Sequence, residues 1–236
     1  MASCEDGFEI TKFSCYLAEI YGTKLTMHMG SRHDYLGMDM EFTKEGTLKV
    51  SMILYLQNVI ANFPEVITGK AATPAMDYLF NVQDDKEARL LDKEQAVAFH
   101  HMVAQVLFMS TRAWRDIQTA VAFLTTRMKA PDEDAWGKLK WVLKFLNGMR
   151  PLKLTVSIIT WDCQNGTLLG PTMCTGTVEN MVALFTMGKG GVSSYSRKIK
   201  LNSKSLTEME LVLADMYMPE LLWSLHFIQE QGYECK

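Results

Sequence analysis

The stretch "DEDAWGKLKWVLKFLNG", residues 132–148, has the complete pattern of an amphipathic helix. Acidic residues fill its first turn, where they complement the positive end of a helix dipole, and Gly148 stands where helices commonly end. Its apolar side chains recur at helical spacing and are Trp136, Leu139, Val142, Leu143 and Leu146. Because such a helix must bury one face, the stretch predicts a helical core in the middle of the chain.

Two further runs with helical spacing precede this stretch. They are "KEQAVAFHHMVAQVLFMS", residues 93–110, and "RDIQTAVAFLTTRM", residues 115–128. A polar, turn-rich segment over residues 67–92 lies before them and predicts a surface loop. The middle third of the chain is therefore predicted to consist of three helices.

The first third mixes helical and strand patterns. The expected elements are a helix over 8–22, strands over 25–29 and within 34–51, and a helix over 51–63. Gly46 is expected in a hairpin turn, Ser51 is expected to cap the second helix, and Pro64 to end it. This third is predicted to be mixed α and β.

The last third begins with the strand pattern "PLKLTVSII". Two more strands, "VALFTMG" and "GVSSYSRKIKLN", are expected to form a hairpin joined by a glycine cluster. A final helix is expected to begin near Ser205 and to break at Pro219 before a second helical run. Residues 161–182 have no clean period of either kind. The chain as a whole is predicted to belong to the α+β class.

Composition excludes several classes of protein. The chain has 236 residues, 48% of them hydrophobic, and a net charge of −3, values that favour a globular protein over a uniformly basic nucleic-acid binder. No apolar run approaches the roughly 20 residues needed to span a bilayer, and no secretory signal is present, so an intracellular protein without a membrane partner is expected. The five cysteines show neither disulfide nor zinc spacing.

Two windows carry positive charge and no acid. In residues 135–161 the basic side chains are Lys138, Lys140, Lys144, Arg150 and Lys153. In residues 180–207 they are Lys189, Arg197, Lys198, Lys200 and Lys204. Such stripes can follow a phosphate backbone, and they can equally be solvated faces.

Several stretches, in order along the chain, resemble the Pol polyprotein of copia-type LTR retrotransposons. "HDYLGMDMEF" resembles the YLG motif after the polymerase catalytic loop, and "FHHMVAQVLFMSTRAWRDIQTAVAFLTTR" and "DAWGKLKWVLKFLNGMRPLKL" resemble the thumb and connection. "SRKIKLNSKSLTEMELVLAD" resembles a strand and the first helix of the ribonuclease H domain. The resemblance implies the end of a reverse transcriptase palm with a primer-support hairpin at 1–66, a helical thumb and connection at 67–150, and a truncated ribonuclease H-like α/β domain at 151–236.

The resemblance also assigns roles to single residues. Tyr35, Leu36 and Gly37 would lie in the hairpin that supports the primer end, and Glu210 would be one of the carboxylates that hold two Mg²⁺ ions in the ribonuclease H site. The polymerase aspartates are expected before Tyr35, and a further ribonuclease H aspartate after residue 236. Because one carboxylate cannot hold two divalent ions, Glu210 is predicted to be vestigial, with no metal or other cofactor bound.

The remaining ribonuclease H aspartate is expected within the unmatched segment 161–182. A shifted reading frame through this segment permits the family-like strings K-W-Y and N-V-H-W-D-C, which suggests two compensating frame slips. In that frame the Leu169 codon excludes aspartate at the required position, and Asp162 lies before it. The adjacent histidines His100 and His101 point in different directions on a helix and are not expected to bind metal.

Three hypotheses follow. The first is a truncated, catalytically inactive remnant of a reverse transcriptase and ribonuclease H polyprotein. The second is a domesticated nucleic-acid-binding protein that uses the two basic windows, with Arg197, Lys198, Lys200 and Lys204 contacting an RNA–DNA hybrid or DNA. The third, a working nuclease, is least favoured because of the missing carboxylates. No small-molecule substrate is expected.

Overall fold

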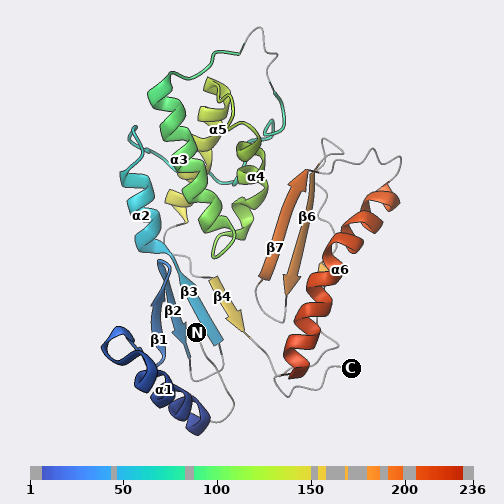
Figure 1. Ribbon diagram of the computed structural model, residues 1–236. Helices are drawn as coiled ribbons and strands as arrows, with labels where there is room; N and C mark the ends of the chain where they lie inside the picture. The colour runs from blue at the N-terminus through green and yellow to red at the C-terminus, as the bar shows by residue number, and fades with distance from the viewer. Residues whose placement is uncertain are drawn as a thin grey trace.

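The apolar core lies in the middle of the chain, as the sequence predicts. In the computed structural model, α3 (Lys93–Ser110), α4 (Gln118–Thr126) and α5 (Glu133–Gly148) pack together, and α2 (Ile53–Ala61) joins them (Figure 1). All five apolar side chains of the stripe expected on α5 are buried. The structure describes residues 7–43, 47–82, 88–149, 154–157, 168–169, 180–186, 191–198 and 206–230.

Two of these helices begin with an aspartate cap. The Asp92 carboxylate accepts a hydrogen bond of 2.7 Å from the backbone N–H of Gln95, and Asp132 accepts one of 2.7 Å from the N–H of Ala135. Each cap satisfies a backbone donor that the first helical turn leaves without a partner. Asp132 is buried and is also paired with Arg127 at 2.8 Å, so the cap of α5 is tied to the end of α4.

The first sheet has four antiparallel strands in the order β1-β2-β3-β4. They are β1 (Arg32–Tyr35), β2 (Met38–Phe42), β3 (Thr47–Ser51) and β4 (Leu154–Ser157). β4 lies beside β3, with Leu48 opposite Val156, although the sequence led us to expect this strand with the C-terminal sheet. The pairing brings residues about a hundred positions apart together, which no local pattern can show.

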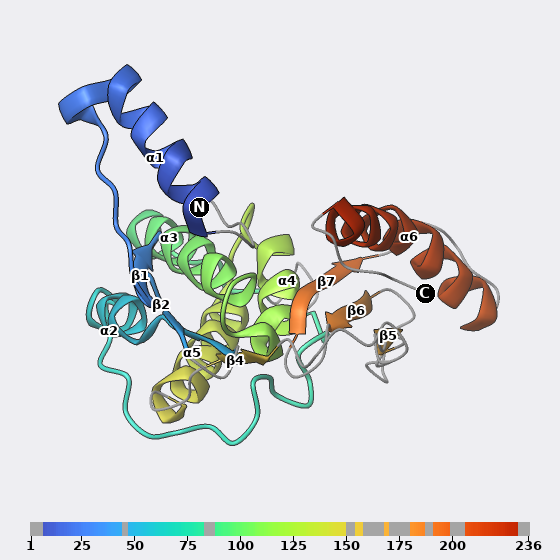
Figure 2. The ribbon, with the colours of Figure 1, turned by 90° about the horizontal axis from the view of Figure 1, so that it is seen from below.

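Two local expectations in this region are wrong. Residues 25–29 do not form a strand, because this apolar run finds no neighbouring strand and instead links α1 (Gly7–Tyr21) and the short helix η1 (Gly22–Lys24) to β1. Ser51 does not cap α2: it ends β3, opposite Asp39, and Met52 is the cap residue. Gly46 lies outside the described residues. The helix α1 leads away from the sheet, and none of its residues is buried (Figure 2).

The second sheet is antiparallel, in the order β5-β6-β7. It contains β5 (Leu168–Leu169), β6 (Asn180–Thr186) and β7 (Gly191–Lys198). The hairpin of β6 and β7 is confirmed, and the segment without a clean period supplies the short edge strand β5. The final helix, α6 (Leu206–Glu230), continues through Pro219, so the expected break is wrong. Proline has no backbone N–H, so the Asp215 carbonyl loses its helical hydrogen bond. Asp215 is exposed, so water can bond to this carbonyl instead.

β7 lies between α6 and the helical core (Figure 1). On one face, Ser193 donates a 2.6 Å hydrogen bond to Glu220, and the Tyr195 ring meets Tyr217 edge to face. On the other face, the short helix η2 (Arg115–Ile117) and α4 contact Ser194. Alternate strand residues point to opposite faces, so a single strand joins both layers.

Replacing Leu143 tests whether the α5 stripe carries the stability of the fold. Leu143 is 0% exposed within the core, so Leu143→Ala should lower the free energy of unfolding by about 2–5 kcal/mol through lost burial and a residual cavity. Leu54→Ala is the matched control, since Leu54 is 75% exposed and should change stability by less than about 0.5 kcal/mol. Urea denaturation measures both. Equal effects would show that the core is not centred on α5.

Candidate nucleic-acid interface

The structure brings the three predicted hairpin residues together in one tight turn. Tyr35 ends β1, and Leu36 and Gly37 connect it to β2. Both connecting residues have positive φ, 52° and 73°, as the central residues of a type I′ hairpin turn do. Glycine tolerates this conformation, whereas a bulky residue such as leucine is strained in it. The side chains of Tyr35 and Leu36 are 52% and 55% exposed, so a strained turn presents an aromatic and an apolar group to solvent.

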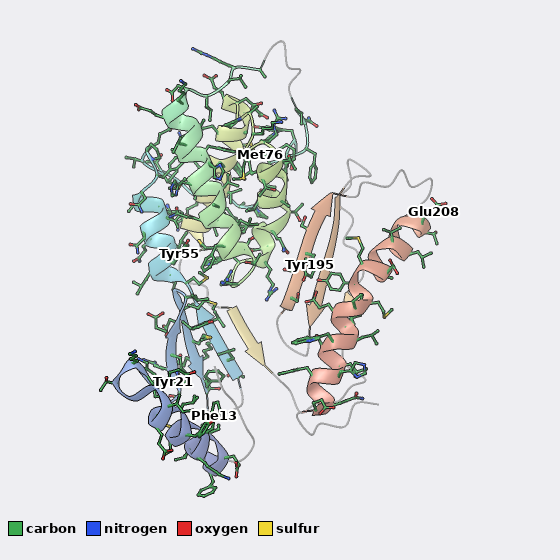
Figure 3. The ribbon with its side chains drawn as sticks, in the orientation of Figure 1. Phe13, Tyr21, Tyr55, Met76, Tyr195 and Glu208 are labelled. Carbon is green, nitrogen blue, oxygen red and sulfur yellow. The ribbon has the colours of Figure 1, made fainter. Side chains whose placement is uncertain are left out.

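This turn rests on the helical core through Tyr55 of α2. A Cβ atom at Gly37 would lie 3.4 Å from Cδ2 of Tyr55, so the turn backbone is in van der Waals range of the ring. Figure 3 shows Tyr55 where α2 meets the first sheet. The Tyr55 and Phe108 ring centroids lie 5.4 Å apart, and the Arg112 guanidinium carbon lies 3.8 Å from the Phe108 centroid. Burial raises the pKa of the Tyr55 phenol, and the nearby charge of Arg112 lowers it.

Two of the five basic residues of the first window, Lys138 and Lys140, contact acids that lie outside it. Lys138 is only 2% exposed; its ammonium donates hydrogen bonds of 2.7 Å to Asp134 and 2.6 Å to the Asn81 carbonyl. Lys140 is bonded to Glu65, whose other oxygen accepts a 2.7 Å hydrogen bond from the Trp136 indole. These two bonds, that from Lys140 foremost, lower the pKa of Glu65. The window contains no acid in sequence, but in the folded chain acids from outside it contact two of its lysines.

The second basic window stays a prediction. Arg197 and Lys198 lie at the end of β7, opposite Met181 and Asn180 of β6. The side chains of both basic residues, and the whole of Lys200 and Lys204, lie outside what the structure describes.

Glu210 lies in the first third of α6, which runs along the β6–β7 hairpin (Figure 1). Its side chain, like Asp162 as a whole, lies outside the described residues. Within the part of the chain that the structure describes, no three His, Cys, Asp or Glu side chains are grouped as metal ligands, and the two histidines of α3 are both exposed. No helix in that part is both long and apolar enough to cross a membrane.

Arg112 is the residue that sequence reasoning missed. It lies outside both basic windows, and it takes its position from the Phe108 ring one helical turn earlier. An arginine four residues after an aromatic side chain at the end of a helix is the signal that could have indicated it.

Replacing Leu36 tests the strain in the turn. Leu36→Asn should raise the free energy of unfolding by about 1 kcal/mol, because asparagine tolerates positive φ. Gly37→Ala should lower the free energy of unfolding by about 1 kcal/mol or more, since it puts a Cβ at positive φ next to Tyr55. Thermal melts of the two variants give the comparison. A less stable Leu36→Asn protein would mean that contacts of the leucine outweigh the strain.

Comparison with known proteins agrees with the resemblance seen in the motifs. Over 219 aligned residues, which cover 88% of the chain, it is 24% identical to the retrovirus-related Pol polyprotein from transposon TNT 1-94 of Nicotiana tabacum. The chain spans 16% of the length of that polyprotein. Neither a protein-family model nor a solved structure matches it. The chain is thus similar, over most of its length, to part of a copia-type retrotransposon Pol polyprotein.

Proposed function

We propose that this chain is a Pol-derived protein that binds nucleic acid at the β1–β2 turn and does not catalyse nucleic-acid synthesis or cleavage. The observation that carries the proposal is the turn itself. Leu36 keeps a strained conformation with its side chain exposed, next to the exposed Tyr35, while Gly37 rests on Tyr55. Backbone strain persists where the surrounding structure enforces it, and such positions cluster at functional sites.

The physical role of the turn would be to hold a nucleic-acid end against the helical core. An exposed tyrosine can stack on a base or pack on a sugar, and this contact tolerates any sequence because every base has a flat face. The ligand would be DNA or an RNA–DNA hybrid. Phosphate contacts would come from the second basic window; in the first window, Lys138 and Lys140 already contact acids.

The absence of catalysis rests on the number of carboxylates. Two-metal cleavage requires carboxylate ligands around both ions, and the partner of Glu210 that the resemblance places within 161–182 is excluded in the shifted frame by the Leu169 codon. If the protein lacks catalysis, it is a remnant of an enzyme. If it also binds nucleic acid, it is a domesticated binder. The two halves fail in different experiments.

The catalytic half is tested with the purified full chain. In Mg²⁺ or Mn²⁺ it should neither cleave the RNA strand of an RNA–DNA hybrid nor extend a primer, as measured on labelled oligonucleotides. The variant Glu210→Ala separates contamination from a real site. Metal-dependent cleavage that disappears in this variant would contradict the proposal.

The binding half is tested by the salt dependence of affinity for duplex DNA. The slope of log K against log salt should be about −0.9 for each phosphate contact, so Lys198→Gln should flatten it by about 0.9 if Lys198 makes one such contact. Lys140→Gln is the control, because the Lys140 ammonium of the wild type already contacts Glu65. This variant should leave the slope unchanged. Fluorescence anisotropy over a salt series measures this. A wild-type chain that does not bind at low salt would refute the binding role.

A further inference from the structure

Arg112 is a cation with no acidic partner in the described part of the chain. It follows the end of α3, and its Nη1 donates long hydrogen bonds to two neutral oxygens, the Phe108 carbonyl at 3.4 Å and the Thr111 hydroxyl at 3.2 Å. Three other arginines differ in having an acidic partner. Arg89 pairs with Glu133, and Arg127 pairs with Asp132. Arg32 likewise pairs with Glu41 across the first sheet.

Among the described residues, the guanidinium of Arg112 is held in place by an aromatic ring and two neutral oxygens, and not by an acid. Its central carbon lies 3.8 Å from the centroid of the Phe108 ring, a cation–π contact. Stacking of this kind orients the flat guanidinium group and leaves the edge donors of the group available. Because the side chain is only partly buried, those donors can meet a ligand from solvent. A pre-oriented guanidinium fork matches the oxygens of a phosphate group.

A continuous set of contacts links this arginine to the β1–β2 turn. Gly37 lies against the Tyr55 ring, Tyr55 lies against Phe108, and Phe108 carries Arg112. The Arg112 charge is close enough to Tyr55 to act on its ionisation. The turn, α2 and the end of α3 therefore form one aromatic surface with Arg112 at its edge.

We propose that Arg112 binds a backbone phosphate of nucleic acid that lies across the β1–β2 turn. This inference rests on the proposed binding function and adds to it a specific phosphate-contacting residue. Tyr35 contacts the base or sugar, and Arg112 contacts a phosphate of the same strand. The arrangement interleaves aromatic and cationic groups, as surfaces that bind nucleic acid without reading its sequence do.

The test compares the affinities of four proteins for one duplex DNA over a salt series. These are the wild-type chain, Arg112→Gln, Arg112→Lys and the control Arg89→Gln, which removes the same charge from a guanidinium already paired with Glu133. Arg112→Gln should raise Kd roughly tenfold, the size expected for one charge-assisted hydrogen bond, and flatten the salt slope by about 0.9. Arg112→Lys should weaken binding and keep the slope, and Arg89→Gln should match the wild type.

The outcomes separate this inference from the proposed function. If the wild type binds and Arg112→Gln has the same Kd and slope, the role of Arg112 is overturned while binding at the turn stands. If the wild type does not bind, both are overturned. Circular dichroism melts check each variant for folding. Should Arg112→Gln fail to fold, Arg112→Lys decides the matter: a raised Kd supports the inference, and an unchanged Kd overturns it.

Discussion

The burial of one apolar stripe, that of α5, is the constraint on which the rest of the structure depends. Leu139, Leu143 and Leu146 are fully enclosed by α3, α4 and α2. Apolar area removed from water is the largest favourable term in folding, so these helices form the stable body of the molecule. The β1–β2 turn and Arg112 are both attached to that body. Tyr55 of α2 contacts the β1–β2 turn, and Arg112, which stacks on Phe108, follows the end of α3.

The C-terminal sheet is joined to this body in a different way. Gln118 donates a buried 2.7 Å hydrogen bond to the Ser194 carbonyl, and Arg115 donates one of 3.2 Å to its hydroxyl. The side-chain amide oxygen of Gln118 and the Ser196 hydroxyl are also buried, and neither has a hydrogen-bond partner among the described residues. Polar contacts add little net stability, and buried groups without partners reduce it. The C-terminal sheet is therefore held to the helices less strongly than the helices are held to one another.

Charge in this protein has to be considered in three dimensions. Glu65, in a loop after α2, neutralises Lys140, which lies 75 residues later in the sequence. The Asn81 carbonyl accepts a hydrogen bond from Lys138, which lies 57 residues later. Two residues of a window that the sequence suggests could bind phosphates, Lys138 and Lys140, are therefore already bonded to other groups of the protein. The reverse holds for Arg112, which is an unremarkable single arginine in the sequence and a pre-oriented cation in the fold. Which basic groups can meet an anionic ligand is thus decided by their neighbours.

The sequence by itself determined the elements whose causes are local. The spacing of apolar residues placed α3, α4 and α5, and the resemblance of the YLG motif placed Tyr35, Leu36 and Gly37 in a hairpin. Only the tertiary structure decided that β4 pairs with β3, that α6 passes through Pro219 without a break, and that Lys138 is buried. The physical reason is distance along the chain. Periodicity and capping act within a few residues, whereas strand pairing and charge neutralisation join groups far apart in sequence, and their partners exist only once the core has folded.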